Sequence, residues 1–255
     1  MTMLSGSPRR SPRRAPAPRP GPLVALEGAH ARFDLAGVRV TALAEGALWI
    51  EAARTLVVSD LHLEKGAAFA RRGQFLPPYD TRATIARLAA LIDAHAPDCV
   101  VSLGDSFHDA HGPAGMAAED AAALAAVVQR TPRFVWIEGN HDPHPPASLG
   151  GEVRAELAIE SLLLRHEPGP EAGVVAGHLH PCAKVAARGR AVRARCFATD
   201  GLRLVMPAFG AYTGGLNVCD AAFASVFGGT PTALILGRAR IHPAAADRLI
   251  PDAFA

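Results

Sequence analysis

The chain has 255 residues, of which 49% are hydrophobic and 20% are charged. This composition is typical of a globular protein with a sizeable core, and no apolar stretch is long enough to cross a membrane. The net charge is +2, but the first twenty residues carry five arginines and no acid, and removing these five charges leaves −3 for the rest. The folded part is therefore not a basic body of the kind that binds nucleic acid by charge alone.

Proline and arginine dominate residues 1–22, which include SGSPRRSPRRAPAPRPGP. Such a segment has almost nothing to bury, so we expect a disordered tail followed by one domain over residues 23–255. The paired arginines are not followed by an apolar segment of about 7 to 15 residues, so no export signal is expected. The four cysteines lack CxxC spacing, and we expect reduced thiols in a cytoplasmic protein.

The first half of the chain alternates predicted strands and helices. RFDLAGVRVTAL (32–43) and GALWIEAA (46–53) predict a pair of strands, and TLVVSD predicts a buried strand that ends in Asp60. YDTRATIARLAALIDAH predicts a helix that Asp80 or Thr81 caps. CVVSLGD and RFVWIEGNHD predict two more strands, with a helix over AAEDAAALAAVVQR between them. This alternation favours an α/β layered fold.

The pattern changes after ASLGGEV. LAIESLLLRHE, GVVAGHLH, RARCFATDGLRLVMP and TALILGRARI predict strands joined by turns, with little helix. We therefore expect one sheet from the first half of the chain and another from the second half, packed together with helices outside. The glycine-rich stretch FGAYTGGLN is interpreted as a connection between strands, because no helix follows it as in a phosphate-binding loop.

Polar side chains follow the apolar runs at several predicted strand ends. They are Asp60 and His62 in SDLHLEKG, Asp105 in GDSFHD, Asn140 and His141 in GNHD, His166 in LLRHEP, and His178 and His180 in GHLH. Loops at the carboxyl ends of strands converge in layered α/β folds, so we expect these side chains to meet. Carboxylates, imidazoles and an amide suit manganese, iron or zinc better than calcium. Each motif alone is also explained by an ordinary turn or by a histidine on the surface. The prediction of a metal site therefore rests on the joint occurrence of the motifs.

The series DLH, GD, GNHD, H and GHLH resembles the calcineurin-like metallophosphoesterase superfamily. The resemblance implies an α/β four-layer sandwich, in which two packed mixed β-sheets are flanked by helices and two divalent metal ions lie on the loops. It implies one metal held by Asp60, His62, Asp105 and His180, and a second held by Asp105, Asn140, His166 and His178. Asp105 would then bridge the two ions.

The chemistry of such a centre is well defined. Two cations about 3.5–4 Å apart clamp the attacking and leaving oxygens of an in-line displacement and acidify a bridging water toward a pKa of about 7. In the family, the residue corresponding to His141 stays off the metals, so His141 is expected to protonate the leaving oxygen or stabilise developing charge. Asp142 is expected to hydrogen-bond the other ring nitrogen of His141, and an ordinary loop acid is the alternative.

SDLHLEKGAAFARRGQFLPPYDT, LGDSFHD, GHLHPCAKV and RLVMPAFGAYTGGLNV together resemble the bacterial ligase-associated DNA-damage-response endonucleases. This resemblance covers most of residues 40–227. It implies manganese-dependent hydrolysis of DNA phosphodiester bonds in DNA repair, in association with a DNA ligase and a helicase. No membrane partner is expected, because no apolar stretch is long enough to span a bilayer.

Two other functions remain open at this stage. A phosphodiesterase or phosphatase for a small nucleotide or a lipid-linked substrate would use the same chemistry, and the charge of −3 favours a small substrate. A catalytically inactive scaffold is the third hypothesis, against which all seven ligand positions and His141 carry competent residues.

Several polar residues beside the motifs have open roles. Lys65, Arg71 and Arg72 follow the first motif and either hold DNA phosphates or are solvated surface charges. His108 and Asp109 follow Asp105 closely enough to support the metal ligands or to touch the substrate.

Overall fold

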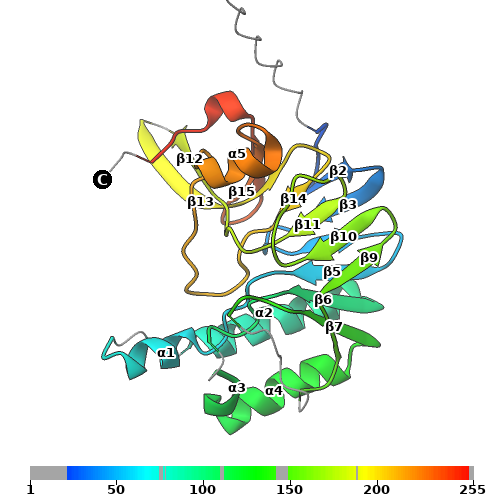
Figure 1. Cartoon of the computed structure of the whole chain (residues 1–255), viewed down its shortest axis with the longest axis vertical. Helices are drawn as coiled ribbons and strands as arrows, with labels where there is room; N and C mark the ends of the chain where they lie inside the picture. Colours follow the sequence, from blue (N-terminus) through cyan, green and yellow to red (C-terminus); the bar gives the residue numbers. More distant parts are fainter. Residues whose placement is uncertain are drawn as a thin grey trace, which may run out of the picture.

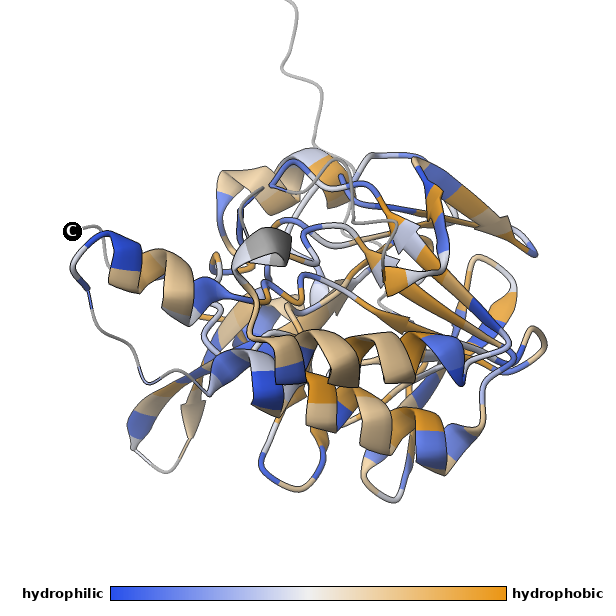
Figure 2. Cartoon of the chain, turned by 90° about the horizontal axis from the view of Figure 1, so that it is seen from below, coloured by the Kyte–Doolittle hydropathy of each residue, from blue (hydrophilic) through white to orange (hydrophobic). Residues whose placement is uncertain are grey.

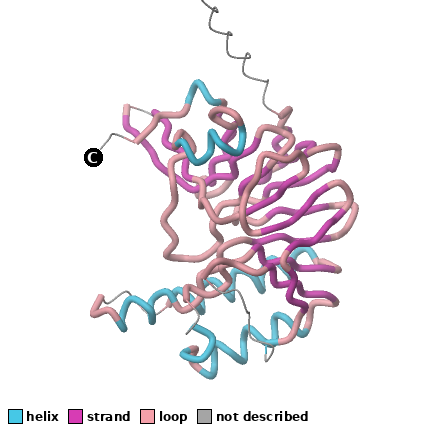
Figure 3. Tube along the Cα trace, viewed as in Figure 1, coloured by secondary structure: helices cyan, strands magenta, loops and turns pink. Residues whose placement is uncertain are grey.

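The structure is a computed structural model that describes residues 22–74, 77, 79–109, 112–141, 149–187 and 189–252. The predicted tail lies outside the described residues, except for Pro22. Two eight-stranded β-sheets pack against each other, and helices cover their outer faces (Figures 1 and 3). The predicted α/β four-layer sandwich is therefore confirmed.

The first sheet contains eight strands in chain order. They are β1 (Ala25–Glu27), β2 (His30–Leu35), β3 (Val38–Ala42), β4 (Leu48–Ile50), β5 (Thr55–Val58), β6 (Cys99–Leu103), β7 (Arg133–Ile137) and β8 (Glu152–Arg154). The strands from β1 to β5 pair antiparallel, and those from β5 to β8 pair parallel. The carboxyl ends of β5, β6 and β7 therefore lie at the same edge of the sheet.

The second sheet is built from the second half of the chain, as expected. Its order is β16 (Ile241–Ala244), β15 (Thr232–Leu236), β13 (Arg190–Thr199), β14 (Leu204–Val205), β11 (Val174–Ala176), β10 (Leu162–Arg165) and β9 (Glu156–Ile159), with β12 (Cys182–Ala187) paired to β13. Strand β11 is parallel to both of its neighbours, β10 and β14. The other pairs are antiparallel, so the sheet is mixed.

The helices are short, apart from α2 and α4. They are α1 (Lys65–Arg71), α2 (Asp80–His95), α3 (Gly112–Gly115), α4 (Ala118–Gln129), α5 (Ala221–Phe227) and the 3₁₀ turn η2 (Ala246–Arg248). Helix α5 falls in the second half of the chain, where the sequence predicted strands joined by turns with little helix. Asp220 caps the start of this helix, since its carboxylate accepts from Ala222 N–H. Among the described residues, no helix has the length and hydropathy needed to cross a bilayer.

Three apolar clusters hold the four layers together. Val40 and Ile50 of the first sheet join Val175 and Phe197 of the second in the cluster between the sheets. A second cluster joins the first sheet to α2 and α4, and a third joins the second sheet to α5. Figure 2 shows the hydrophobic residues along the strands inside the molecule. Burial of this surface is the main force that fixes the sheets relative to each other.

The structure corrects two local predictions. RFDLAGVRVTAL is not one strand but a hairpin, because Ala36 and Gly37 both take positive φ, 50° and 88°, between β2 and β3. Asp80 and Thr81 do not cap α2, which begins after Tyr79 without a side-chain cap.

The two side chains instead bond to the segment that follows His62. Asp80 Oδ2 accepts a 2.9 Å bond from Gly66 N–H, and Thr81 Oγ1 accepts a 2.8 Å bond from Glu64 N–H. This tertiary contact replaces the local cap and fixes the entry to α1.

Candidate metal centre

The loops after five strands converge at one edge of the sandwich. Asp60 and His62 follow β5, and Asp105 follows β6. Asn140 follows β7, while the remaining histidines follow β10 and β11 of the other sheet. The structure therefore brings together the side chains that the sequence analysis expected to meet.

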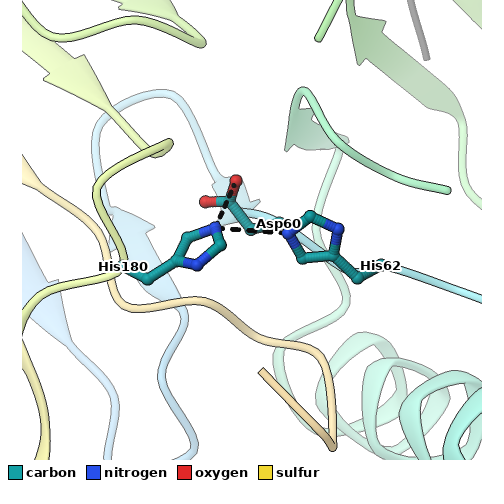
Figure 4. Close-up of side chains that lie close together, drawn as sticks. All are labelled: Asp60, His62 and His180. Carbon is teal, nitrogen blue, oxygen red and sulfur yellow. Dashed lines mark hydrogen bonds and ion pairs between the residues drawn. The ribbon is translucent and has the colours of Figure 1, made fainter. Parts of the chain in front are cut away.

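Asp60, His62 and His180 form the first group, with one ligand atom of each within 4.8 Å of the others. The Nε2 atoms of His62 and His180 lie 3.2 Å apart, and His180 Nε2 lies 3.1 Å from Asp60 Oδ1 (Figure 4). Residues 60 and 180 thus meet across 120 positions of the chain, as the metal hypothesis requires.

Asp105, His166 and His178 form the second group, again with ligand atoms within 4.8 Å. Asn140 Oδ1 points into this group, 2.8 Å from His166 Nε2 and 3.0 Å from His178 Nδ1. His166 Nε2 lies 3.5 Å from Asp105 Oδ2. All seven residues predicted as ligands therefore lie in or against one of the two groups.

The two groups adjoin each other. Asp60 Oδ1 of the first group lies 3.9 Å from His166 Nδ1 of the second. His178 N–H donates to Asp60 Oδ2 at 3.1 Å, and His62 N–H donates to the backbone oxygen of Asp105 at 2.9 Å. Because the groups adjoin, two histidines only two positions apart in GHLH can serve different groups. His178 belongs to the second group and His180 to the first.

Backbone strain is concentrated at the candidate ligands. Of the ten non-glycine residues with positive φ in the described part of the chain, five are candidate ligands: Asp60 (51°), His62 (43°), Asp105 (46°), His178 (67°) and His180 (46°). Each such residue costs on the order of 1–3 kcal/mol, which the surrounding structure must offset. Strain of this kind gathers at sites where geometry serves a function rather than stability.

Burial and charge set the protonation of these groups. Burial lowers the pKa of His62 to about 3, despite the nearby Asp60, so its ring is neutral and has a free lone pair. Burial raises the pKa of Asp105, but the hydrogen bond and charge of His166 outweigh this and hold it at about 2. Burial lowers the pKa of His166, but the carboxylates of Asp105 and Asp60 hold it at about 9.

The donor set fits a pair of divalent cations. The two carboxylates favour a positive charge among the imidazoles, which is either a proton on His166 or a bound cation. Ring nitrogens only 3.2 Å apart occur in both groups, between His62 and His180 and between His166 and His178. A cation accepts lone pairs from both nitrogens of such a pair at once. Nitrogen and oxygen donors without a thiolate suit manganese, iron or zinc.

Ser59, Gly104 and Gly177 support the ligands and were not among the site residues predicted from sequence. Ser59 Oγ, fully buried, donates a 2.6 Å bond to Asp60 Oδ2. A Cβ at Gly104, whose φ is +69°, would lie 2.4 Å from His166 Nδ1. The glycine that precedes each motif, in GD and GHLH, is the signal that could have identified both positions.

Gly177→Ala is expected to weaken manganese binding by about 10- to 100-fold, the range seen when groups that orient metal ligands are lost. The new Cβ would lie 1.9 Å from Ser59 Oγ and 2.4 Å from Asp60 Oδ2, so one of these side chains must move. Calorimetric titration with manganese measures the change. Gly229→Ala is the matched control, because nothing lies within 4 Å of its Cβ. Equal affinities in the two variants would contradict the assigned role of Gly177.

His141 lies beside the two groups but belongs to neither. Its side chain is 45% exposed, and its Nε2 lies 4.0 Å from Asp105 Oδ2. Its backbone N–H donates to Asp105 Oδ1 at 2.9 Å. His108 stacks on the His141 ring at 5.9 Å and contacts the His62 ring edge-on at 5.7 Å. Asp142, the expected partner of His141, lies outside the described residues.

The basic residues after the first motif differ in their surroundings. Arg71 is paired with Asp109 at 2.6 Å, and the Lys65 ammonium lies 5.7 Å from the centre of the Phe69 ring. Arg72 is exposed. Arg71 is exposed as well but is ion-paired, and Lys65 is half-buried.

Comparison with known proteins agrees with this geometry. Residues 53–162 match the family of calcineurin-like phosphoesterases. The crystal structure of the nuclease MPE of Pseudomonas putida is similar, with 30% sequence identity and a TM-score of 0.66, over 84% of this chain and 100% of that one. No curated protein matches the sequence. The chain therefore belongs to the calcineurin-like phosphoesterase family and is a hydrolytic metallophosphoesterase with two candidate metal sites.

Proposed function

We propose that this protein is a DNA endonuclease that hydrolyses phosphodiester bonds at a two-metal centre, with manganese as the most suitable ion. The observation that carries the proposal is the pair of adjoining groups of nitrogen and oxygen ligands. The similarity to a nuclease and the resemblance to ligase-associated endonucleases support DNA as the substrate. Iron and zinc suit the same donors.

The proposed roles follow the two groups. Asp60, His62 and His180 would hold one ion, Asn140, His166 and His178 would hold the other, and Asp105 would be shared by both. When bound, the pair of ions supplies charge for the phosphoryl oxygens and acidity for a bound water.

His141 is partly exposed beside both groups, near Asp105 and His62, where it can donate a proton to the leaving oxygen. Asp142 is proposed to hold the His141 ring in the required tautomer. These two residues complete the proposed site without binding either ion.

The cellular setting is also proposed. All four cysteines are free, three of them buried, which favours a reducing compartment such as the cytoplasm. DNA repair, in association with a DNA ligase and a helicase, is proposed from the family resemblance alone.

The test is nicking of supercoiled plasmid by the full chain with manganese, compared with hydrolysis of cyclic nucleotides under the same conditions. We expect the plasmid to be nicked and chelation with EDTA to stop the reaction. Hydrolysis of the cyclic nucleotides without nicking would instead favour the small-substrate phosphodiesterase, which the net charge of −3 outside the tail supports.

A further inference from the structure

A cleft lies near the loops of the metal centre, between the β12–β13 hairpin and the loop that joins β14 to α5, with Ala44, Leu236 and Gly237 on its remaining side. Its volume is about 420 Å³. We call it the arginine cleft, and its polar part is lined by Cys182, Arg193, Arg195, Thr213 and Gly214.

The pairing of β12 with β13 gathers positive charge on one face of the hairpin. Lys184 lies opposite Arg193, and Cys182 lies opposite Arg195, so all four side chains share a face. Two cations directly opposite each other destabilise a sheet. Asp252 offsets part of this repulsion, with ion pairs of 3.7 Å to Lys184 and 3.3 Å to Arg193.

Arg195 has no such counter-charge. It donates only to backbone oxygens, of Ala208 at 2.8 Å and of Gly210 at 3.3 Å, and no carboxylate lies within ion-pair distance of it in the part of the chain that is described. Arg87 lies near enough for the two charges to repel each other, and its guanidinium stacks 4.1 Å from the Phe209 ring. Glu45 attracts Arg87, and one carboxylate, Asp252, is shared by Lys184 and Arg193. The positive charge left over at the cleft is therefore that of Arg195 together with one charge of the Lys184–Arg193 pair.

The cleft also contains a donor without an acceptor. Thr213 Oγ1 is buried and has no hydrogen-bond partner among the described residues. Gly214, next in the chain, has nothing within 4 Å of the position of a Cβ, so a ligand can approach its backbone closely. Two guanidinium groups, a hydroxyl and an open backbone segment are the donors that proteins use to bind phosphate.

Backbone contacts fix the cleft relative to the metal centre. In the loop after β14, Phe209 N–H donates to Ser59 O at 2.7 Å and Gly210 N–H donates to Asp60 O at 3.1 Å. On the other side, Cys182 follows His180 by two residues, a reach of at most about 7 Å along the chain. The cleft is thus anchored to the ligand loops of the first group.

We propose that the arginine cleft binds a phosphate of the substrate strand next to the phosphate that is cleaved. This inference rests on the proposed function, because it assumes a nucleic acid chain at the metal centre. It accounts for DNA binding by a body whose net charge is −3. Local charge beside the site replaces the overall basic charge that the composition lacks.

The experiment compares two substrates in manganese, an oligodeoxynucleotide, which has flanking phosphates, and bis(p-nitrophenyl) phosphate, which has none. Arg193→Gln and Thr213→Val are expected to lower the ratio of kcat/KM for the oligonucleotide to that for the small diester, roughly tenfold for Arg193, mainly through KM. Arg193→Gln should also reduce the slope of log affinity for the oligonucleotide against log salt by about 0.7.

Two further variants keep the test sharp. Arg190→Gln is the control, because Arg190 is an exposed residue of the same strand whose side chain points to the opposite face from Arg193. This variant should leave the ratio of the two kcat/KM values unchanged. Asp252→Asn removes the counter-charge of Lys184 and Arg193, and should raise the ratio.

The outcomes separate this inference from the proposed function. An equal ratio in Arg193→Gln, Thr213→Val and the parent protein would overturn the cleft as a strand site while leaving the hydrolase intact. Weaker binding of inorganic phosphate to Arg193→Gln, with unchanged oligonucleotide cleavage, would show a site for a free anion and also overturn it. Absence of hydrolysis of both substrates by the parent protein would contradict the proposed function itself.

Discussion

Asp105→Ala is expected to lose nearly all phosphodiester hydrolysis, at least about 10³-fold, because metal charge stabilisation is worth several kcal/mol and each 1.36 kcal/mol is tenfold in rate. Asp105 is 2% exposed and belongs to the group that contains His166 and His178. Its Oδ1 also accepts the N–H of His141. A single truncation therefore disturbs the proposed ligands of both ions and the position of the proposed acid. Initial rates and metal content on the same sample measure the effect.

Asp105→Asn tests whether the negative charge of Asp105, rather than the size of its side chain, is needed for metal binding. The amide has nearly the same size and can keep the bond from His141 N–H, but it lacks the negative charge that offsets the repulsion between two cations. We expect it to bind less manganese than the parent protein while keeping its fold. An Asp105→Ala protein with two bound ions and near-normal activity would contradict the bridging role.

His141→Ala is expected to keep both ions and to lower the rate about 10²- to 10⁴-fold, the range for losing a general acid or base. The ring lies outside both groups and is 45% exposed, so no ligand is lost with it. Alanine also keeps the backbone N–H that donates to Asp105. The fall should appear in kcat, because the proton is needed only as the leaving oxygen departs.

The control for this variant is His95→Ala, since His95 lies at the end of α2 against Trp49, outside both metal-ligand groups. It should retain the parent rate if it folds. Loss of metal uptake in His141→Ala would show that His141 is a ligand and that the assignment of ligand and acid is wrong.

The sequence identified the candidate ligands but not the backbone conformations that hold them in place. Each candidate ligand stood at the end of an apolar run, and parallel strands bring such ends to one edge, so Asp60 and Asp105 could be placed together from pattern alone. The positive φ values of the ligands could not be predicted, because strain at a site depends on contacts from distant segments.

Tertiary contacts explain the other differences. Asp80 had the right position to cap α2 but bonds to Gly66 instead, since the first turn of α1 offers an N–H without a partner in that helix. The register of strands β12 and β13 could not be predicted either, because nothing in the local sequence places Lys184 opposite Arg193. The arginine cleft therefore appears only when β12 and β13 are paired.

Seven side chains are proposed to hold two neighbouring cations. The most direct measurement is a crystal structure of the full chain grown with manganese, with anomalous scattering recorded at the manganese edge. Two peaks about 3.5–4 Å apart are expected, one contacted by Asp60, His62 and His180, the other by Asn140, His166 and His178, and both by Asp105. A single peak, or no peak at these side chains, would contradict the two-metal centre.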